Sequence, residues 1–357
     1  MTAFTLVDEP DSITSELHDL PLVGVDTEFM REKTFFAQLC LVQLATPERI
    51  YCVDPLAGNP MQAFWDETFR NTWVVHSARQ DIEVIFQSSG AMPAKLFDTQ
   101  IAAALLGMQP QIGYAGLVKE LFDFEIPKSH TRADWSRRPL DDALLHYAVE
   151  DVEYLLPAYE RLGERLEKSG RLTWAEEDST LLLDESLYAF DESQAVQRLK
   201  GARNFRGRRR SAAERLAVWR EAEAARRNRP RQWILRDSAL LDIAHNLPNT
   251  MADLRDIDGL PPKLVNRAGE ELLAVVTRSA NDTHEYQPPP PPDETQKKLL
   301  KSMQAEVAAS ADELGISPEL LAPRKELAAA IVSGKTDSRA FLGWRKDLIG
   351  DRLLRLL

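Results

Sequence analysis

Strand-like stretches occur only in the first hundred residues of this chain, and this uneven distribution most constrains its fold. Runs rich in apolar, β-branched and aromatic residues occupy 20–29, 35–46, 49–55 and 72–77. Stretches with helical periodicity begin at residue 78 and occupy 78–90, 97–107, 114–124 and 144–156. Short neighbouring strands interspersed with helices are typical of an α/β domain with a mixed sheet. Beyond about residue 200 only helical patterns remain, so the rest of the chain is predicted to be all-α.

The helical part is predicted to contain two small domains. Residues 1–200 would form the α/β domain with a trailing helical linker, and residues 205–285 and 293–357 would form the two all-α domains. A run of prolines at 288–292 separates them and favours a stiff, extended spacer. Each helical part has a long charged helix, a short helix, a turn and a final helix. This shared order indicates a diverged tandem repeat.

Charge is distributed unevenly along the chain. The net charge of −12 by itself argues against a nucleic-acid partner. Residues 201–231, however, contain eleven arginines, no lysine and three glutamates, a local charge of +8. This run is either a track for nucleic-acid phosphates or an exposed helix face balanced by the acidic first domain.

The sequence indicates a cytoplasmic protein. No apolar run approaches the roughly 20 residues that a membrane helix needs, and the N-terminus has no signal-peptide pattern. Cys40 and Cys52 lie in strand-like apolar runs and are expected to be reduced core residues.

Four carboxylates occupy positions close to apolar, core-forming residues. The run "VGVDTEF" places Asp26 and Glu28 two residues apart in a strand, so both face the same side of the sheet. Asp81 follows a buried strand near the start of a helix, where acids also act as partners of the helix dipole. On the helix 144–156, Asp151 lies in the apolar stripe with Tyr147 one turn before it. Each acid taken singly has an ordinary structural explanation.

Taken together, four carboxylates that face one interior repel one another and must either take up protons or bind cations. Ligands that are all oxygen favour Mg²⁺ or Mn²⁺ over zinc. Two such ions roughly 3.5–4 Å apart stabilise the attacking and leaving oxygens of a phosphoryl displacement. A tyrosine one helical turn from a ligand can orient the attacking water. The cluster therefore predicts two divalent metal ions and no small-molecule cofactor.

The order of these residues resembles the DEDD exonuclease superfamily in its tyrosine-bearing subclass. The motifs that carry the resemblance are "VDTEF" (Asp26, Glu28), "HSARQDIE" (Asp81) and "HYAVEDVEYL" (Tyr147, Asp151). The helical parts are similar to HRDC domains, which are auxiliary nucleic-acid-binding modules. The resemblance implies a ribonuclease H-like fold and a metal-dependent 3′–5′ exoribonuclease that releases nucleoside 5′-monophosphates. It also implies an RNA partner with structure and a short single-stranded 3′ end, such as a tRNA precursor.

The same resemblance implies a role for each motif residue. Asp26 would bridge both metal ions, and Glu28 and Asp151 would complete one of the two sites. Asp81 would help to hold the other ion through water. Tyr147 would position the nucleophilic water rather than attack covalently.

Two basic stretches are candidate RNA contacts, the loop 127–140 and the arginine-rich run, although each residue can also be a solvated surface charge. The candidate substrate-binding residues are Lys128, Arg137, Arg138, Arg208, Arg209 and Arg210. Two other functions are compatible with the sequence: a DNA 3′–5′ exonuclease with the same metal site, and a catalytically idle RNA-binding scaffold. A monomeric protein is expected.

Overall fold

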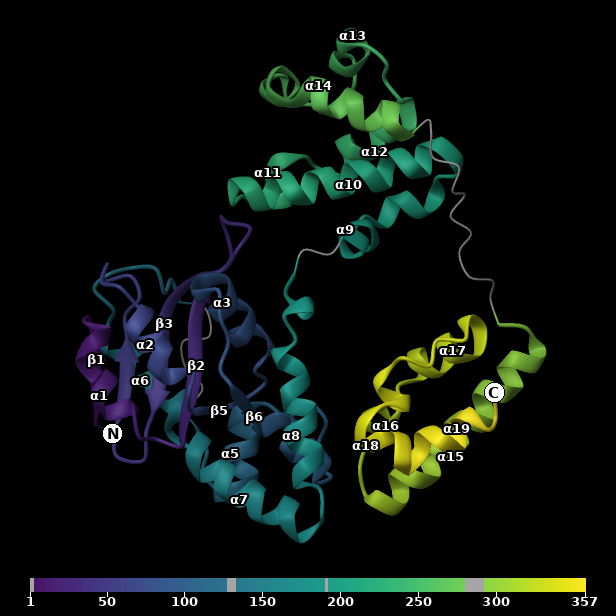
Figure 1. Ribbon diagram of the computed structural model, residues 1–357. Helices are drawn as coiled ribbons and strands as arrows, with labels where there is room; N and C mark the ends of the chain where they lie inside the picture. The colour runs from purple at the N-terminus through teal and green to yellow at the C-terminus, as the bar shows by residue number, and fades with distance from the viewer. Residues whose placement is uncertain (1–2, 127–132, 190–191, 280–291) are drawn as a thin grey trace. The chain divides into compact units, whose positions relative to one another are not determined.

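The computed structural model describes residues 3–126, 133–189, 192–279 and 292–357 (Figure 1). Tertiary contacts divide the chain into two compact units. The first unit contains the α/β domain and the helices that follow the proline run. The second contains the helices before the proline run together with the short segment Arg31–Gln38. Apart from Pro292, the predicted proline spacer lies outside the described residues.

A six-stranded sheet forms the centre of the α/β domain, with the spatial order β1-β4-β3-β2-β5-β6. The strands are β1 (Phe4–Val7), β2 (Leu22–Met30), β3 (Gln38–Ala45), β4 (Ile50–Val53), β5 (Thr72–Val75) and β6 (Lys95–Asp98). β3 is antiparallel to β4, whereas β1 is parallel to β4, and β5 is parallel to both β2 and β6. The sheet is therefore mixed, as predicted. The sequence did not indicate β1 and β6, although the equally short strands β4 and β5 were predicted.

Helices that pack on this sheet supply the rest of the domain (Figure 1). They are α1 (Thr14–Leu17), α2 (Gln62–Thr68), α3 (Arg79–Ser89), α4 (Thr99–Leu105), α5 (Tyr114–Phe122), α6 (Asp142–Glu153), α7 (Leu155–Lys168) and α8 (Leu172–Thr180). The predicted helix 144–156 is divided, because α6 ends at Glu153 and α7 starts two residues later. Pro157 explains the division, since it has no N–H to donate to the Glu153 carbonyl.

The second unit is all-α, as predicted. Its helices are α9 (Glu192–Arg198), α10 (Gly207–Arg227), α11 (Arg231–Ile234), α12 (Asp237–Asn246), α13 (Met251–Arg255) and α14 (Pro262–Arg278). The segment from the β2–β3 connection packs against the end of α10. Asn228 Oδ1 accepts hydrogen bonds from the N–H groups of Phe35 and Phe36, each at 3.0 Å. The Arg231 guanidinium lies 4.7 Å from the centre of the Phe35 ring.

The first three helices after the proline run match three helices of the second unit in length and spacing. The helices after the run are α15 (Glu294–Leu314), α16 (Pro318–Leu321), α17 (Arg324–Ser333), α18 (Gly343–Arg345) and α19 (Asp351–Leu354). α15, α16 and α17 begin and end 87 residues after α10, α11 and α12, respectively. Buried positions repeat at the same offset, for example Leu216 and Met303, or Leu240 and Leu327. Matching bounds and matching buried positions support the predicted tandem repeat.

The second copy of this repeat is held on the α/β domain by a buried ion pair. Arg345 has only 1% of its surface exposed, and its two terminal nitrogens each bind one oxygen of Asp178 on α8 at 2.6 Å. Beside it, the rings of Trp344 and Trp174 stack with their centres 4.3 Å apart. The C-terminal helices therefore belong to the same packing unit as the sheet.

Two expectations from composition can be compared with the structure. Cys40 and Cys52 are buried free thiols, as predicted. Among the described residues, no helix has the length and apolar character needed to cross a membrane.

Candidate active site

The central strand β2 carries the first two predicted acids. Asp26 and Glu28 flank Thr27, so their side chains leave the sheet on the same face. Both carboxylates are half-buried, whereas Thr27 is buried. The Thr27 hydroxyl donates a hydrogen bond to Asp81 Oδ1 at 2.5 Å. This bond ties β2 to the first turn of α3, where Asp81 is 7% exposed.

Helix α6 carries the remaining two motif residues. Tyr147 and Asp151 lie four residues apart and therefore share one face of the helix. The two side chains are joined by a hydrogen bond from the Tyr147 hydroxyl to the Asp151 carboxylate. α6 packs against β2, which brings this face toward the two acids of the strand. Asp151 is half-buried, so it lies at the edge of the apolar stripe and not inside it.

Three of the four predicted carboxylates converge on one point. Asp26, Glu28 and Asp151 each contribute an oxygen, and these oxygens all lie within 4.8 Å of one another. Asp81 is not part of this group of three, but its charge is the strongest of the carboxylate charges that act on Asp26. A half-buried set of oxygen ligands at this spacing fits a hard divalent cation. The donor set thus agrees with a divalent metal site.

Burial is the largest cause of the raised carboxyl pKa values in this cluster, and repulsion between the acids adds to it. The pKa of Asp26 is raised well above its usual range, and that of Glu28 to about 8. The pKa values of Asp81 and Asp151 are raised to about 7, although the hydrogen bonds from Thr27 and Tyr147 lower them. Without a cation the cluster therefore retains protons at neutral pH. A bound cation would replace those protons.

Burial, followed by the charges of Asp151, Glu28 and Asp26, also raises the pKa of the Tyr147 hydroxyl. The phenol therefore stays protonated at neutral pH. Its proton is directed to Asp151, which leaves its oxygen lone pairs able to accept a hydrogen bond from water.

Sequence reasoning did not assign two aromatic residues a place beside this site. Trp135 is 5% exposed, and its ring centre lies 6.2 Å from that of Tyr147. The hydroxyl of Tyr114, on α5, accepts a hydrogen bond at 2.9 Å from the N–H of Tyr154, the residue that follows α6. Neither contact has a local sequence signal, because both join residues from separate elements. His76 binds Thr99 and the Ile112 carbonyl, each at 2.9 Å.

The basic loop before α6 contains both an internal and an exposed arginine. Arg138 makes five hydrogen bonds within the protein, to both carboxylate oxygens of Asp54 and to the carbonyls of Cys40, Trp135 and Arg137. These contacts hold the loop in place, so binding of an RNA phosphate by Arg138 would break some of them. Arg137 is exposed and lines a cavity. Lys128 lies outside the described residues.

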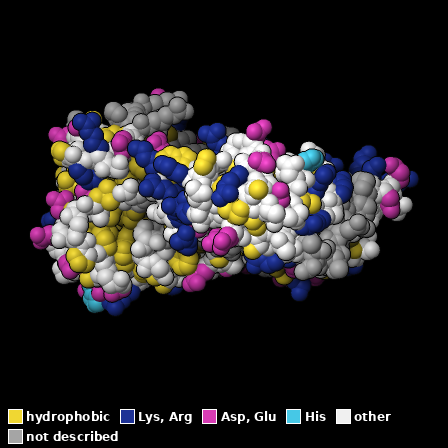
Figure 2. Space-filling view, turned by 90° about the horizontal axis from the view of Figure 1, so that it is seen from above, with side chains coloured by type: hydrophobic (Ala, Val, Ile, Leu, Met, Phe, Trp, Pro, Cys, Tyr) yellow, Lys and Arg dark blue, Asp and Glu magenta, His cyan; other side chains and the backbone are white. Residues whose placement is uncertain are grey.

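The arginine-rich run is less available for RNA than its sequence charge indicates. Three glutamates of α10 form ion pairs with surrounding arginines: Glu214 with Arg210, Glu221 with Arg198 and Arg231, and Glu223 with Arg226, Arg227 and Arg267. Arg220 is buried and binds Asp237 at 2.5 Å. Arg208 and Arg209 are exposed, and neither forms an ion pair within the described residues. Figure 2 shows Lys and Arg side chains in several groups, separated by hydrophobic and acidic ones.

Comparisons with known proteins agree with this geometry. The 3′-5′ exonuclease family matches residues 1–167, and the HRDC domain family matches residues 209–276. Ribonuclease D of Jannaschia sp. is 38% identical over 370 aligned residues, which cover 99% of this chain and 94% of the relative. Ribonuclease D of Pseudomonas paraeruginosa is 36% identical and covers 94% of this chain and 92% of the relative.

A solved structure supports the same assignment over the whole chain. The crystal structure of Escherichia coli RNase D, described as an exoribonuclease involved in structured RNA processing, superimposes with a TM-score of 0.87. It has 27% sequence identity, and the match covers 99% of this chain and 98% of that one. The resemblance to tyrosine-bearing DEDD exonucleases is thereby confirmed. This chain belongs to the ribonuclease D family of 3′–5′ exoribonucleases.

Proposed function

We propose that this chain shortens RNA from the 3′ end by a two-metal-ion mechanism and that its substrates include tRNA precursors. The observation that carries the proposal is the convergence of three half-buried carboxylates within 4.8 Å, with a hydrogen-bonded tyrosine beside them. A scaffold that only bound RNA would have no need of such a self-repelling cluster. The same cluster agrees with Mg²⁺ or Mn²⁺ as the cofactor.

Each residue of the cluster has a distinct part in the proposed reaction. Bound divalent ions would supply charge neutralisation and lower the pKa of a coordinated water. Asp26, Glu28 and Asp151 would hold these ions on the face shared by β2 and α6, and Asp81 would help to hold one of them through water. The Tyr147 oxygen would accept a hydrogen bond from the attacking water and orient it. Because Tyr147 stays protonated, it acts by position and not as a base.

The bond changes define the product that should be found. The water oxygen attacks the phosphorus of the last phosphodiester, and the bond from that phosphorus to the 3′ oxygen of the preceding nucleotide breaks. The terminal residue leaves as a nucleoside 5′-monophosphate, and the leaving 3′ oxygen takes up a proton from the water, so the shortened chain ends in a 3′ hydroxyl. Repetition of this step degrades the RNA in the 3′ to 5′ direction.

An assay with end-labelled RNA and DNA tests the proposal. Wild-type protein with Mg²⁺ or Mn²⁺ should release 5′-monophosphates from RNA with a single-stranded 3′ extension, including a tRNA precursor, and EDTA should stop the release. Asp26→Asn should abolish hydrolysis without loss of folded structure, as judged by circular dichroism. Retained metal-dependent turnover in that variant would exclude the proposed site. Equal degradation of single-stranded DNA would favour the alternative DNA exonuclease, and RNA binding without any cleavage would favour the scaffold.

A further inference from the structure

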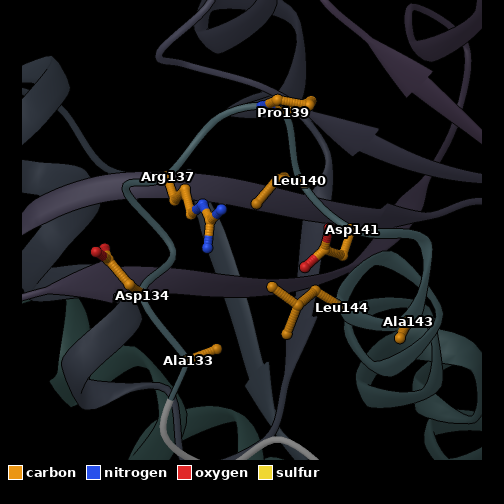
Figure 3. A pocket seen from close by; sticks show the side chains of 8 residues that line it. All are labelled: Ala133, Asp134, Arg137, Pro139, Leu140, Asp141, Ala143 and Leu144. Carbon is orange, nitrogen blue, oxygen red and sulfur yellow. The ribbon is translucent and has the colours of Figure 1, made fainter.

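A cavity of about 250 Å³ lies between residues 133–140, the described end of the basic loop, and the first turn of α6 (Figure 3). Leu140, Leu144, Pro139 and Ala133 form apolar walls. Its volume is below the range of about 300–1,000 Å³ that is common for sites of drug-sized ligands. A cavity of this size fits a single planar ring system better than a larger molecule.

Two opposite charges face this cavity. Figure 3 shows Arg137 and Asp141 with their side chains directed into it, whereas Asp134 points away. Asp141 precedes α6, yet its carboxylate makes no capping hydrogen bond to the helix. Within the described part of the chain, Arg137 and Asp141 form no ion pair with each other or with another residue. The cavity therefore presents a donor group and an acceptor group that are both available to a ligand.

The cavity is placed beside the acidic cluster by the geometry of α6. Leu144, Tyr147 and Asp151 are spaced three and four residues apart, so they follow one face of the helix. All three are half-buried, so this face is partly open along its length. At about 1.5 Å rise per residue, Leu144 is about 10 Å along the helix from Asp151. That separation is comparable to the distance between a phosphodiester and the base of a neighbouring nucleotide.

Arg138, the next residue in the sequence, holds the cavity wall that carries Arg137. Arg138 binds the buried Asp54 through two nitrogens, at 2.6 and 2.7 Å, and the Cys40 carbonyl at 2.7 Å. These bonds connect the loop to β3 and to the residue that follows β4. A wall held at several points keeps its shape before a ligand arrives, which reduces the entropy lost on binding.

We propose that this cavity is a nucleobase subsite for a nucleotide next to the hydrolysed bond. The base would insert between the apolar walls, the Arg137 guanidinium would stack on the ring or donate to its acceptors, and Asp141 would accept from its N–H groups. Every RNA base has both donors and acceptors on its edge, so the subsite would tolerate all four bases. The inference rests on the proposed function in one respect, namely that the polymer bound at the cluster is RNA.

Measurements of equilibrium RNA binding distinguish a contact with the base from an electrostatic contact with phosphate. Labelled RNA is titrated with Asp26→Asn protein in Mg²⁺, so that the substrate stays intact, and fluorescence anisotropy gives the Kd. A second RNA carries abasic residues at its last two positions. Intact RNA should bind about tenfold more tightly than abasic RNA, which is the lower range of a base–protein contact. In the double variant Asp26→Asn, Arg137→Ala, only the binding of intact RNA should weaken, so the two RNAs should bind with similar Kd values.

Matched variants make the result specific. Arg165→Ala removes one exposed arginine from the last turn of α7, outside the cavity, and should preserve the preference for intact RNA. Asp141→Asn should reduce the preference for intact RNA. Because this change removes a negative charge, electrostatics alone would not weaken RNA binding. Equal loss of affinity for both RNAs in Arg137→Ala would overturn the base subsite and indicate a phosphate contact. No loss for either RNA would overturn it as well. Turnover by the wild-type protein is measured separately, so failure of the proposed function is recognised independently of these affinities.

Discussion

Replacing Glu28 with glutamine should stabilise the metal-free protein at pH 8 while it impairs hydrolysis. Burial, and then repulsion from Asp151 and Asp81, raises the pKa of Glu28 from 4.5 to about 8. In the unfolded chain the same carboxyl ionises near its ordinary pKa. Below about pH 4.5 it is protonated in both states, and the stability associated with its raised pKa is fully present. That stability is lost as the pH rises through the folded-state pKa of about 8.

The size of the effect follows from the pKa difference. Each tenfold change in proton affinity corresponds to about 1.4 kcal/mol, so Glu28 lowers the free energy of unfolding by on the order of 4 kcal/mol as the pH rises from about 4.5 to about 8. For a domain of 150–250 residues, about 1 kcal/mol shifts Tm by roughly 2–4 °C. Glu28→Gln has no charge to desolvate. Its Tm in EDTA at pH 8 should therefore exceed that of the wild type by on the order of 10 °C.

Thermal unfolding followed by circular dichroism at pH 5, 6.5 and 8 would test this prediction. The difference between variant and wild type should be small at pH 5 and grow with pH. Saturating Mn²⁺ should reverse the order at pH 8, because the cation stabilises the wild-type cluster and binds the variant less well. Glu120→Gln, an exposed position on α5, controls for the loss of one charge. A Tm difference that is absent, or that is the same at pH 5 and pH 8, would contradict the electrostatic account.

Three further variants test Tyr147, the arginines of α10 and the buried ion pair of Arg345. Tyr147→Phe should lower kcat by about 100-fold with little change in KM, because only the orientation of water is lost; an unchanged kcat would remove Tyr147 from the mechanism. Exchange of Arg208 and Arg209 for alanine should weaken RNA binding and reduce the slope of log Kd against log salt by roughly 1.4, as expected for two lost contacts to single-stranded phosphates. The pair Lys297→Ala and Lys298→Ala on α15 is the control and should leave the slope unchanged. Arg345→Met should lower the free energy of unfolding by about 3–5 kcal/mol in urea titrations, since Asp178 is then buried without its partner; a loss below about 1 kcal/mol would show that the pair does not hold the C-terminal helices.

The acidic cluster could be predicted from sequence because its geometry is local. The spacing of Asp26 and Glu28 in a strand determines their shared face, and the spacing of Tyr147 and Asp151 in a helix does the same. The meeting of the two faces required only that a strand and a helix pack together. The contact of Trp135 with Tyr147 has no such local rule, and the pairing of Arg138 with Asp54 joins residues 84 positions apart. The periodicity of apolar residues does not predict contacts made by side chains of a loop.

Counting charges overestimates the basic surface for a similar reason. The run 201–231 contains eleven arginines but only three acids. A single carboxylate, however, can pair with several guanidinium groups, as Glu223 does with Arg226, Arg227 and Arg267. Glu221 and Glu223 therefore each engage more than one arginine. Arg208 and Arg209, in the first turn of α10, remain the best candidates for a phosphate contact.

The two copies of the helical repeat have diverged in charge more than in structure. Residues 207–231 carry nine arginines and three glutamates, a charge of +6, whereas the corresponding residues 294–318 carry three lysines and four acids, a charge of −1. The helices that match in bounds thus differ in their attraction for a polyanion. The second copy, in addition, uses Arg345 and Trp344 to pack on α8. Duplication explains this division, because one copy can lose its basic surface and pack on the α/β domain while the other keeps exposed arginines, which we propose contact RNA.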